Sequence, residues 1–362
     1  MLSDNIKLLS SIIKNDRGSI SDRLRPGACD PREFAEFAGN NLLSGALFQS
    51  ISASGLGGLF PGALIDGFKS AYLDQWKQNE LLIKGMEDVS ALFAAAGIDV
   101  IFLKGPLLAQ RFYGDIASRA VGDIDILVKT GSVGEAGKLL VGNGFTLRSG
   151  TVLGKALSAY FAHHFEYKKD DIYLEVHWLL HRHISYKPDQ EYIWAQRKAV
   201  DLNGRTYYVL SDEYELTLQL LSLLSDIQLG IARCRTFLDI FRILESIAGE
   251  TDWELFFENR NRERILSVSV NMLDLVLKAL GCAGSFPGLS AQISKNGRLV
   301  KAMSEEDMGR LLQPSRFALQ NKLWAWSLYE CGPARSFCWW AISLPFRIAV
   351  YRKLSSSKFT VK

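Results

Sequence analysis

The stretch "RAVGDIDILV" (119–128) places two acidic residues one residue apart in an otherwise apolar run. On a strand, alternation sends Asp123 and Asp125 to one face and Ile124 and Ile126 to the other. Two neighbouring carboxylates repel each other, and a strand that only packs into a core can use Val or Thr at these positions instead. We therefore expect the acid pair to have a function that offsets this repulsion.

A second stretch, "IYLEVHW" (172–178), has the same two-sided character. Alternation places its apolar residues on one face and Glu175 with His177 on the other. If the two strands are neighbours, Asp123, Asp125 and Glu175 converge, and such a cluster is stable only around a divalent cation. Oxygen ligands of this kind select Mg²⁺ or Mn²⁺, and carboxylate-bound Mg²⁺ is the usual partner of nucleoside-triphosphate phosphates.

A candidate phosphate-binding turn precedes the acid pair. The β-branched run "IDVIFLK" (98–104) predicts a buried strand, and "GPLLAQRFY" begins a helix directly after it. Gly105 lets the backbone approach a ligand closely, and the N-terminus of the helix favours an anion. Lys104 is expected to reach a phosphate. The cradle for the phosphates and the metal ligands would then come from adjacent strands.

The order of the remaining patterns predicts an α+β fold, with a small mixed sheet between N-terminal and C-terminal helical parts. Apolar spacing predicts a helix over 68–96, and the Gly- and Ser-rich stretch 50–67 reads as a loop or hinge. Two strands with a turn at 169–171 are expected in 163–178, and helices from Ser211 onward. We divide the chain into a helical segment with a hinge (1–67), an α/β core (68–205) and a helical domain (206–362).

The ordered set of motifs is similar to a known family. "FLKGPLLAQRFYGDIASRAVGDIDILV", "HHFEYKKDDIYLEVHWLL" and the later "LLSLLSDIQLGIARCRTFLDIFRILE" resemble the uncharacterised bacterial nucleotidyltransferases of the polymerase-beta superfamily, over roughly residues 80–285. The resemblance implies that Asp123 and Asp125 bind the metal and that Glu175 is the third carboxylate. It also implies that Gly105 forms the phosphate-binding turn and that Arg119 is the basic residue before the acid-pair strand.

The resemblance implies an enzyme that transfers NMP from an NTP, with ATP the expected donor, to an unidentified acceptor and releases pyrophosphate. Asp123, Asp125 and Glu175 would be the catalytic and metal-binding residues with Mg²⁺ or Mn²⁺, and Glu175 would act with them on a second metal or as general base. Lys104 and Arg119 would neutralise phosphate charge. Nucleic acid is not an expected partner, because no basic patch with interleaved aromatic residues follows the core.

Two other functions stay open. The superfamily turn is usually Gly-Ser or Gly-Gly, whereas Pro106 here removes one N–H donor, so a non-catalytic nucleotide-binding or scaffold protein is an alternative. The second alternative is peripheral contact with a membrane surface, since the segment after Glu330 carries six basic residues and no acidic one. Packing of its aromatic residues into the protein is the simpler expectation for that segment.

All five histidines lie between His163 and His183, and this clustering suggests a zinc site. However, His177 is expected on a strand and His181 beyond its end, so the helical spacing of two zinc ligands does not apply. We therefore favour structural roles, with His177 orienting Glu175. The five scattered cysteines include no CxxC pair and fit a reducing compartment, which with the absence of a secretory signal predicts a cytoplasmic location.

Overall fold

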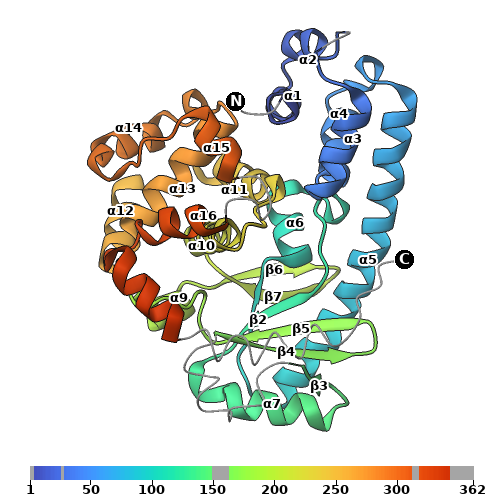
Figure 1. Cartoon of the computed structure of the whole chain (residues 1–362). Coiled ribbons are helices and arrows are strands. Elements are labelled where there is room, and N and C mark those ends of the chain that lie inside the picture. The colour runs from blue at the N-terminus through green and yellow to red at the C-terminus, as the bar shows by residue number, and fades with distance from the viewer. Residues whose placement is uncertain (1–3, 26–27, 149–162, 312–317, 343–362) are drawn as a thin grey trace. The chain divides into compact units, whose positions relative to one another are not determined.

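The computed structural model describes residues 4–25, 28–148, 163–311 and 318–342. It confirms the expected α+β class, with many helices and one mixed sheet (Figure 1). The chain divides into two compact units, each built from three segments. The first contains 1–79, 109–121 and 216–330, and the second contains 80–108, 122–215 and 331–362. Every strand within the described residues belongs to the second unit.

The described part of the second unit contains a seven-stranded sheet with the order β3-β4-β5-β2-β1-β7-β6. Its strands are β1 (Ile101–Leu103), β2 (Ile124–Leu127), β3 (Thr146–Leu147), β4 (His164–Lys169), β5 (Ile172–His177), β6 (Lys198–Leu202) and β7 (Arg205–Val209). The pairs β2·β5 and β1·β7 are parallel, and the other neighbouring pairs are antiparallel. The neighbouring strands β2 and β5 are the two that carry the acids.

Two short turns set the register of the hairpins. Asp170 adopts a positive φ of 50° between β4 and β5, which an Asp side chain tolerates better than most. Between β6 and β7, Asn203 and Gly204 have φ values of 56° and 75°, the conformation of a tight Asn-Gly hairpin turn. The β4–β5 hairpin matches the sequence prediction, whereas β6, β7 and the short β3 were not predicted.

Helix α5 (Gly62–Ala95) covers the apolar face of the sheet with its C-terminal half. A Cβ atom at Gly85 would lie 3.0 Å from the Cδ1 atoms of Ile124 and Ile172, so the helix backbone lies directly against β2 and β5. The alternation of residues therefore leaves the acidic residues of both strands on the opposite face. Gly97, with φ of 67°, follows the end of the helix as the sequence predicts.

The interpretation of 50–67 as a loop or hinge is wrong for most of its length. Helix α4 (Ser44–Ala53) runs into this stretch, a 3-10 turn occupies Gly57–Leu59, and α5 begins at Gly62. Glycine lowers helix propensity by about 1 kcal/mol per residue. Burial of apolar residues such as Ile51 and Leu64 compensates for this penalty.

The first unit is helical in its described residues. It holds α1 (Asp4–Ile13), α2 (Arg17–Arg23), α3 (Pro31–Asn40), α4, α11 (Cys234–Ile247), α12 (Trp253–Arg262), α13 (Leu266–Ala279), α14 (Pro287–Lys295), α15 (Glu305–Leu311) and α16 (Ala318–Trp326). Helix α11 is strongly amphipathic and buries Phe237, Phe241 and Leu244. Packing of such faces forms the core of this unit.

Two further helices, α6 (Gly105–Tyr113) and α10 (Asp212–Leu229), begin in the second unit and end in the first. Helix α10 begins after Ser211, whose Oγ accepts a hydrogen bond from the Tyr214 N–H at 3.4 Å, in the predicted capping position. The second unit also contains α7 (Val133–Gly142) and α9 (Gln190–Ala195). Among the described helices, none has the length and apolar character required to cross a bilayer. The basic residues from Arg347 onward lie outside the described residues.

Candidate active site

Asp125 and Glu175 are direct neighbours on the sheet. They are register partners of the parallel β2·β5 pair, and Ile124 pairs with Leu174 on the opposite face. Asp125 is only 9% exposed, whereas the Glu175 side chain is 26% exposed. The buried carboxylate and the more accessible one therefore share a face, as the alternation of both sequences predicts.

His177 joins the two carboxylates. Its Nε2 lies 2.9 Å from Asp125 Oδ1 and 3.1 Å from Glu175 Oε2, and its side chain is 6% exposed. The predicted contact between His177 and Glu175 is thus present, and the contact with Asp125 accompanies it. One imidazole N–H faces two carboxylate oxygens, which holds both acids close together.

These contacts shift the pKa values of His177 and Asp125. Burial by itself lowers the pKa of His177, but its hydrogen bonds to Asp125 and Glu175 outweigh burial and raise the pKa to about 9. Burial raises the pKa of the Asp125 carboxyl, but the hydrogen bond from His177 and the charge of Lys104 hold it well below its usual range. Asp125 is therefore ionised at neutral pH, as a metal ligand must be.

Lys104 and Gly105 form the turn between β1 and α6. Leu103, the last residue of β1, pairs with Asp125, so the turn begins directly beside the acidic strand. Both residues have positive φ values, 49° for Lys104 and 61° for Gly105. The glycine fits this conformation without strain, and α6 begins at Gly105 as predicted. The positive charge of Lys104 helps to lower the pKa of the Asp125 carboxyl.

Asp123 directly precedes β2 and is partly buried. Alternation along the chain gives it the same face as Asp125. Among the described residues, the groups close enough to share a metal ion contain Asp125, Glu175 and His177 but not Asp123. Its role as a metal ligand stays a prediction.

Arg119 lies in the first unit and has a buried acidic partner. Its Nε donates to Asp239 Oδ1 at 2.9 Å, and the two side chains are 4% and 1% exposed. Tyr113 donates to the same oxygen at 2.7 Å. The Arg119 carbonyl accepts a hydrogen bond from Asn79. These contacts lie within the first unit, and nucleotide binding by Arg119 stays a prediction.

The donor set fits a divalent cation. Asp125 and Glu175 each offer a carboxylate oxygen, and these lie with His177 Nε2 within 4.8 Å of one another. Two adjacent carboxylates, one of them buried and ionised, are the ligands that Mg²⁺ and Mn²⁺ prefer. The imidazolium of His177 compensates their charge in the metal-free protein.

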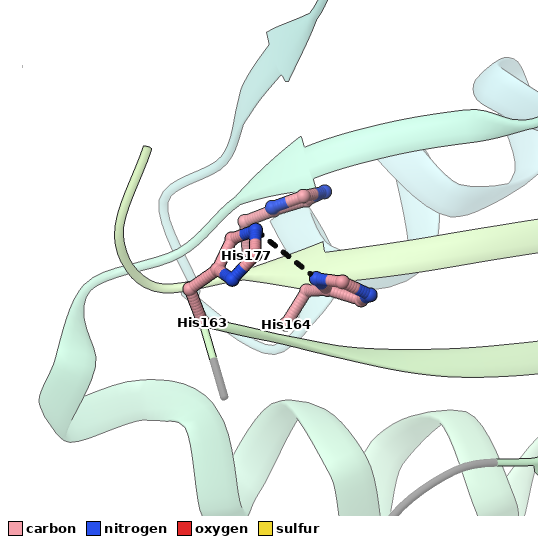
Figure 2. Close-up of side chains that lie close together, drawn as sticks. All are labelled: His163, His164 and His177. Carbon is pink, nitrogen blue, oxygen red and sulfur yellow. Dashed lines mark hydrogen bonds between the residues drawn. The ribbon is translucent and has the colours of Figure 1, made fainter. Parts of the chain in front are cut away.

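Three more residues of the β4–β5 hairpin belong to this neighbourhood and were not predicted as site residues. His164 pairs with His177 across the hairpin, and Glu166 pairs with Glu175. Figure 2 shows His163, His164 and His177 turned towards one another, with His163 Nε2 and His164 Nδ1 3.4 Å apart. Burial, together with the charges of its histidine neighbours and of Lys104, lowers the pKa of His163 well below its usual value.

The sequence held a signal for this pairing. A two-residue turn at 170–171 pairs Lys169 with Ile172, and counting back five residues along each strand pairs His164 with His177. The spacing of residues along the chain does not by itself reveal neighbours on paired strands, whereas the position of the turn does.

Comparison with protein families assigns the chain to a family. A family model described as "Uncharacterised nucleotidyltransferase" matches residues 28–281, which is more than half of the chain. The protein belongs to this nucleotidyltransferase family. The match spans the sheet, the Lys104–Gly105 turn and the acids of β2 and β5. A comparison with curated proteins finds no match.

Solved nucleotidyltransferase structures are only distantly similar. The crystal structure of ANT(2″)-Ia in complex with adenylyl-2″-tobramycin is 14% identical, with a TM-score of 0.36, covering 50% of this chain and 98% of that one. An antigenic nucleotidyltransferase-like protein from Paracoccidioides brasiliensis is 15% identical, with a TM-score of 0.32, covering 57% of this chain and 93% of that one. The assignment to the nucleotidyltransferase family rests on the family model.

Proposed function

We propose that this protein transfers a nucleoside monophosphate from an NTP, with ATP the expected donor, to a hydroxyl or phosphate acceptor, and releases pyrophosphate. The pairing of Asp125 with Glu175 on adjacent parallel strands carries the proposal. Membership of the nucleotidyltransferase family supports the reaction class.

Asp125 and Glu175, with Asp123, would hold Mg²⁺ or Mn²⁺. Such an ion neutralises triphosphate charge and lowers the pKa of a bound hydroxyl. Lys104 would add a positive charge beside the phosphates, and the backbone at Gly105 would allow them to approach closely.

Glu175 is the better candidate for general base. Its side chain is more exposed than that of Asp125, so an acceptor hydroxyl can reach it. The hydrogen bond from His177 fixes its orientation. Glu175 would accept the proton of the acceptor hydroxyl as that oxygen attacks the α-phosphorus.

Nucleotide binding without turnover is the second candidate function. Pro106 at the start of α6 favours it, because a proline nitrogen cannot donate a hydrogen bond to a phosphate. Pyrophosphate released from any NTP and acceptor would exclude this candidate.

Thermal unfolding with each NTP tests the proposal. We expect a rise in melting temperature with one NTP in the presence of Mg²⁺ or Mn²⁺, because a ligand that binds only the native state stabilises it. Asp123→Asn with Asp125→Asn should abolish this rise, and pyrophosphate release with that NTP should follow.

The matched control is Asp99→Asn. Asp99 is a half-exposed carboxylate paired with Lys129 on the surface of the same unit. This variant should respond to nucleotide like the wild type. If no NTP shifts the wild-type melting temperature with either metal, the proposed function is wrong.

A further inference from the structure

We propose that His163, His164 and His177 form a second metal site, selective for a transition-metal cation, with Zn²⁺ as the best match. Figure 2 shows the three side chains, and the contacts of His177 with Asp125 and Glu175 place the site beside the carboxylates. The inference goes beyond the proposed function, because nucleotidyl transfer with carboxylate-bound Mg²⁺ requires no nitrogen-ligated ion.

The spacing of the histidine nitrogens supports this site. Each of the three rings offers a nitrogen, and these atoms lie within 4.8 Å of one another. In a tetrahedral site with Zn–N bonds of about 2.0–2.1 Å, two ligating nitrogens lie about 3.3–3.4 Å apart. His163 Nε2 and His164 Nδ1 are 3.4 Å apart, which matches such an edge and is long for a hydrogen bond.

The two ring nitrogens of His177 have different surroundings. Its Nε2 contacts Asp125 and Glu175, whereas its Nδ1 is buried and has no hydrogen-bond partner. A histidine that binds a metal through one nitrogen usually gives the N–H of the other to a carboxylate. His177 has this arrangement, and a cation that displaces the Nδ1 proton to solvent would give this buried nitrogen the partner that it lacks.

The ligand type decides the class of metal. Three imidazole nitrogens suit Zn²⁺ and its neighbours such as Co²⁺, whereas Mg²⁺ prefers oxygen ligands. Three protein ligands leave a fourth position for a water or a ligand oxygen. Glu175 Oε2 lies 3.8 Å from His164 Nε2 and 3.1 Å from His177 Nε2, so it faces the ring nitrogens that do not bind the proposed ion and would orient both rings.

A competing set of ligands shares His164. His164, Glu166 and Glu175 also lie close enough to hold one ion, and that mixed set has two carboxylates. The three-histidine set is favoured by the unpartnered Nδ1 of His177, which the mixed set leaves unexplained. Substitutions at His163 and Glu166 separate the two, because each residue belongs to only one of these sets.

Cobalt is the probe that tests the site. The chelator-treated full-length protein is titrated with Co²⁺ in excess Mg²⁺ and without nucleotide, and the visible absorption of tetrahedral Co²⁺ is recorded. We expect one equivalent of bound Co²⁺ per chain with a tetrahedral spectrum, displaced by Zn²⁺. His163→Gln and His164→Gln should each abolish the spectrum and weaken Zn²⁺ binding by more than the ten- to hundredfold loss typical of an orienting partner.

His183→Gln is the matched control, since His183 belongs to none of the ligand groups among the described residues. It should bind Co²⁺ like the wild type, and the variants' melting temperatures in chelator verify that they fold. No tetrahedral Co²⁺ spectrum in the wild type, or the same spectrum in His163→Gln, would overturn the proposal. Loss of the spectrum in Glu166→Gln with retention in His163→Gln would assign the ion to the mixed set and would also overturn it. Pyrophosphate release, measured separately, reports on the proposed function alone.

Discussion

Asp125 on β2 and Glu175 on β5 face each other as register partners, yet one carboxylate is buried and the other is partly exposed. This difference suggests that Glu175, besides holding the proposed metal with Asp125, is the residue that meets the acceptor. The two roles can be separated by substitution.

We expect Glu175→Gln to retain NTP binding, because Asp125 and Asp123 would still hold the metal, and to slow pyrophosphate release by about 10²- to 10⁴-fold, the usual contribution of a general base. Asp125→Asn should abolish both, because it removes the buried carboxylate that we propose as a metal ligand. Binding is measured by the melting-temperature shift and turnover by released pyrophosphate. Equal loss of binding in the two variants would refute the division of roles.

The buried Arg119–Asp239 pair should be important for stability. Asp239→Asn removes the negative charge that is paired with the buried Arg119 guanidinium, so we expect the free energy of unfolding to fall by about 3–5 kcal/mol. The control is Asp22→Asn, which breaks an exposed pair with Arg25 and should change stability by about 0–1 kcal/mol. Urea unfolding measures both. Similar small losses in the two variants would show that Arg119 does not depend on Asp239.

Gly45 should not tolerate a side chain. A Cβ atom there would lie 2.5 Å from the Ala117 carbonyl oxygen, and this backbone precedes the acidic strand. We expect Gly45→Ala to destabilise the protein by about 1–3 kcal/mol, as overpacking usually does. Gly39→Ala in α3 meets no atom within 4 Å and serves as the control in the same thermal unfolding measurement. A melting temperature as high as that of Gly39→Ala would contradict the close approach.

The cysteines should differ sharply in reactivity. Burial raises the pKa of the Cys234 thiol to about 12. The pKa of the Cys282 thiol is raised to about 11, and burial is the main cause. Almost no thiolate therefore forms at either residue at neutral pH. Cys338 is exposed. With a thiol reagent at neutral pH, Cys338 should react rapidly and Cys234 only after unfolding. Peptide mapping of the labelled native protein provides the measurement, and early labelling of Cys234 would contradict its burial.

The sequence predicted the parts of the site that depend on local alternation. The strands around Asp125 and Glu175, their shared face and the turn at Gly105 follow from periodicity and residue type. The missed β6–β7 hairpin also had a local signal, the Asn203–Gly204 pair with positive φ at both residues.

Long-range partners had no such signal. The acidic partner of Arg119 lies 120 residues further along the chain, on α11, where Asp239 looks like any helix residue. The helical part of 50–67 was missed for a related reason, since burial by distant segments outweighs the local preference of glycine. The pairing of His164 with His177 could be predicted in part. It follows from the position of the hairpin turn, but it does not follow from the spacing of the two residues along the chain.

The hairpin turn at Asp170 has an evolutionary consequence for the proposed metal ligands at the far end of β4 and β5. An insertion or deletion of one residue there, although far from His164 along the strand, would shift the pairing and send alternate side chains to the other face of the sheet. Selection to retain the histidine and glutamate pairs would therefore act on the length of this turn as well as on the identity of the ligands. Relatives that change the turn length should be those that have also lost the histidines.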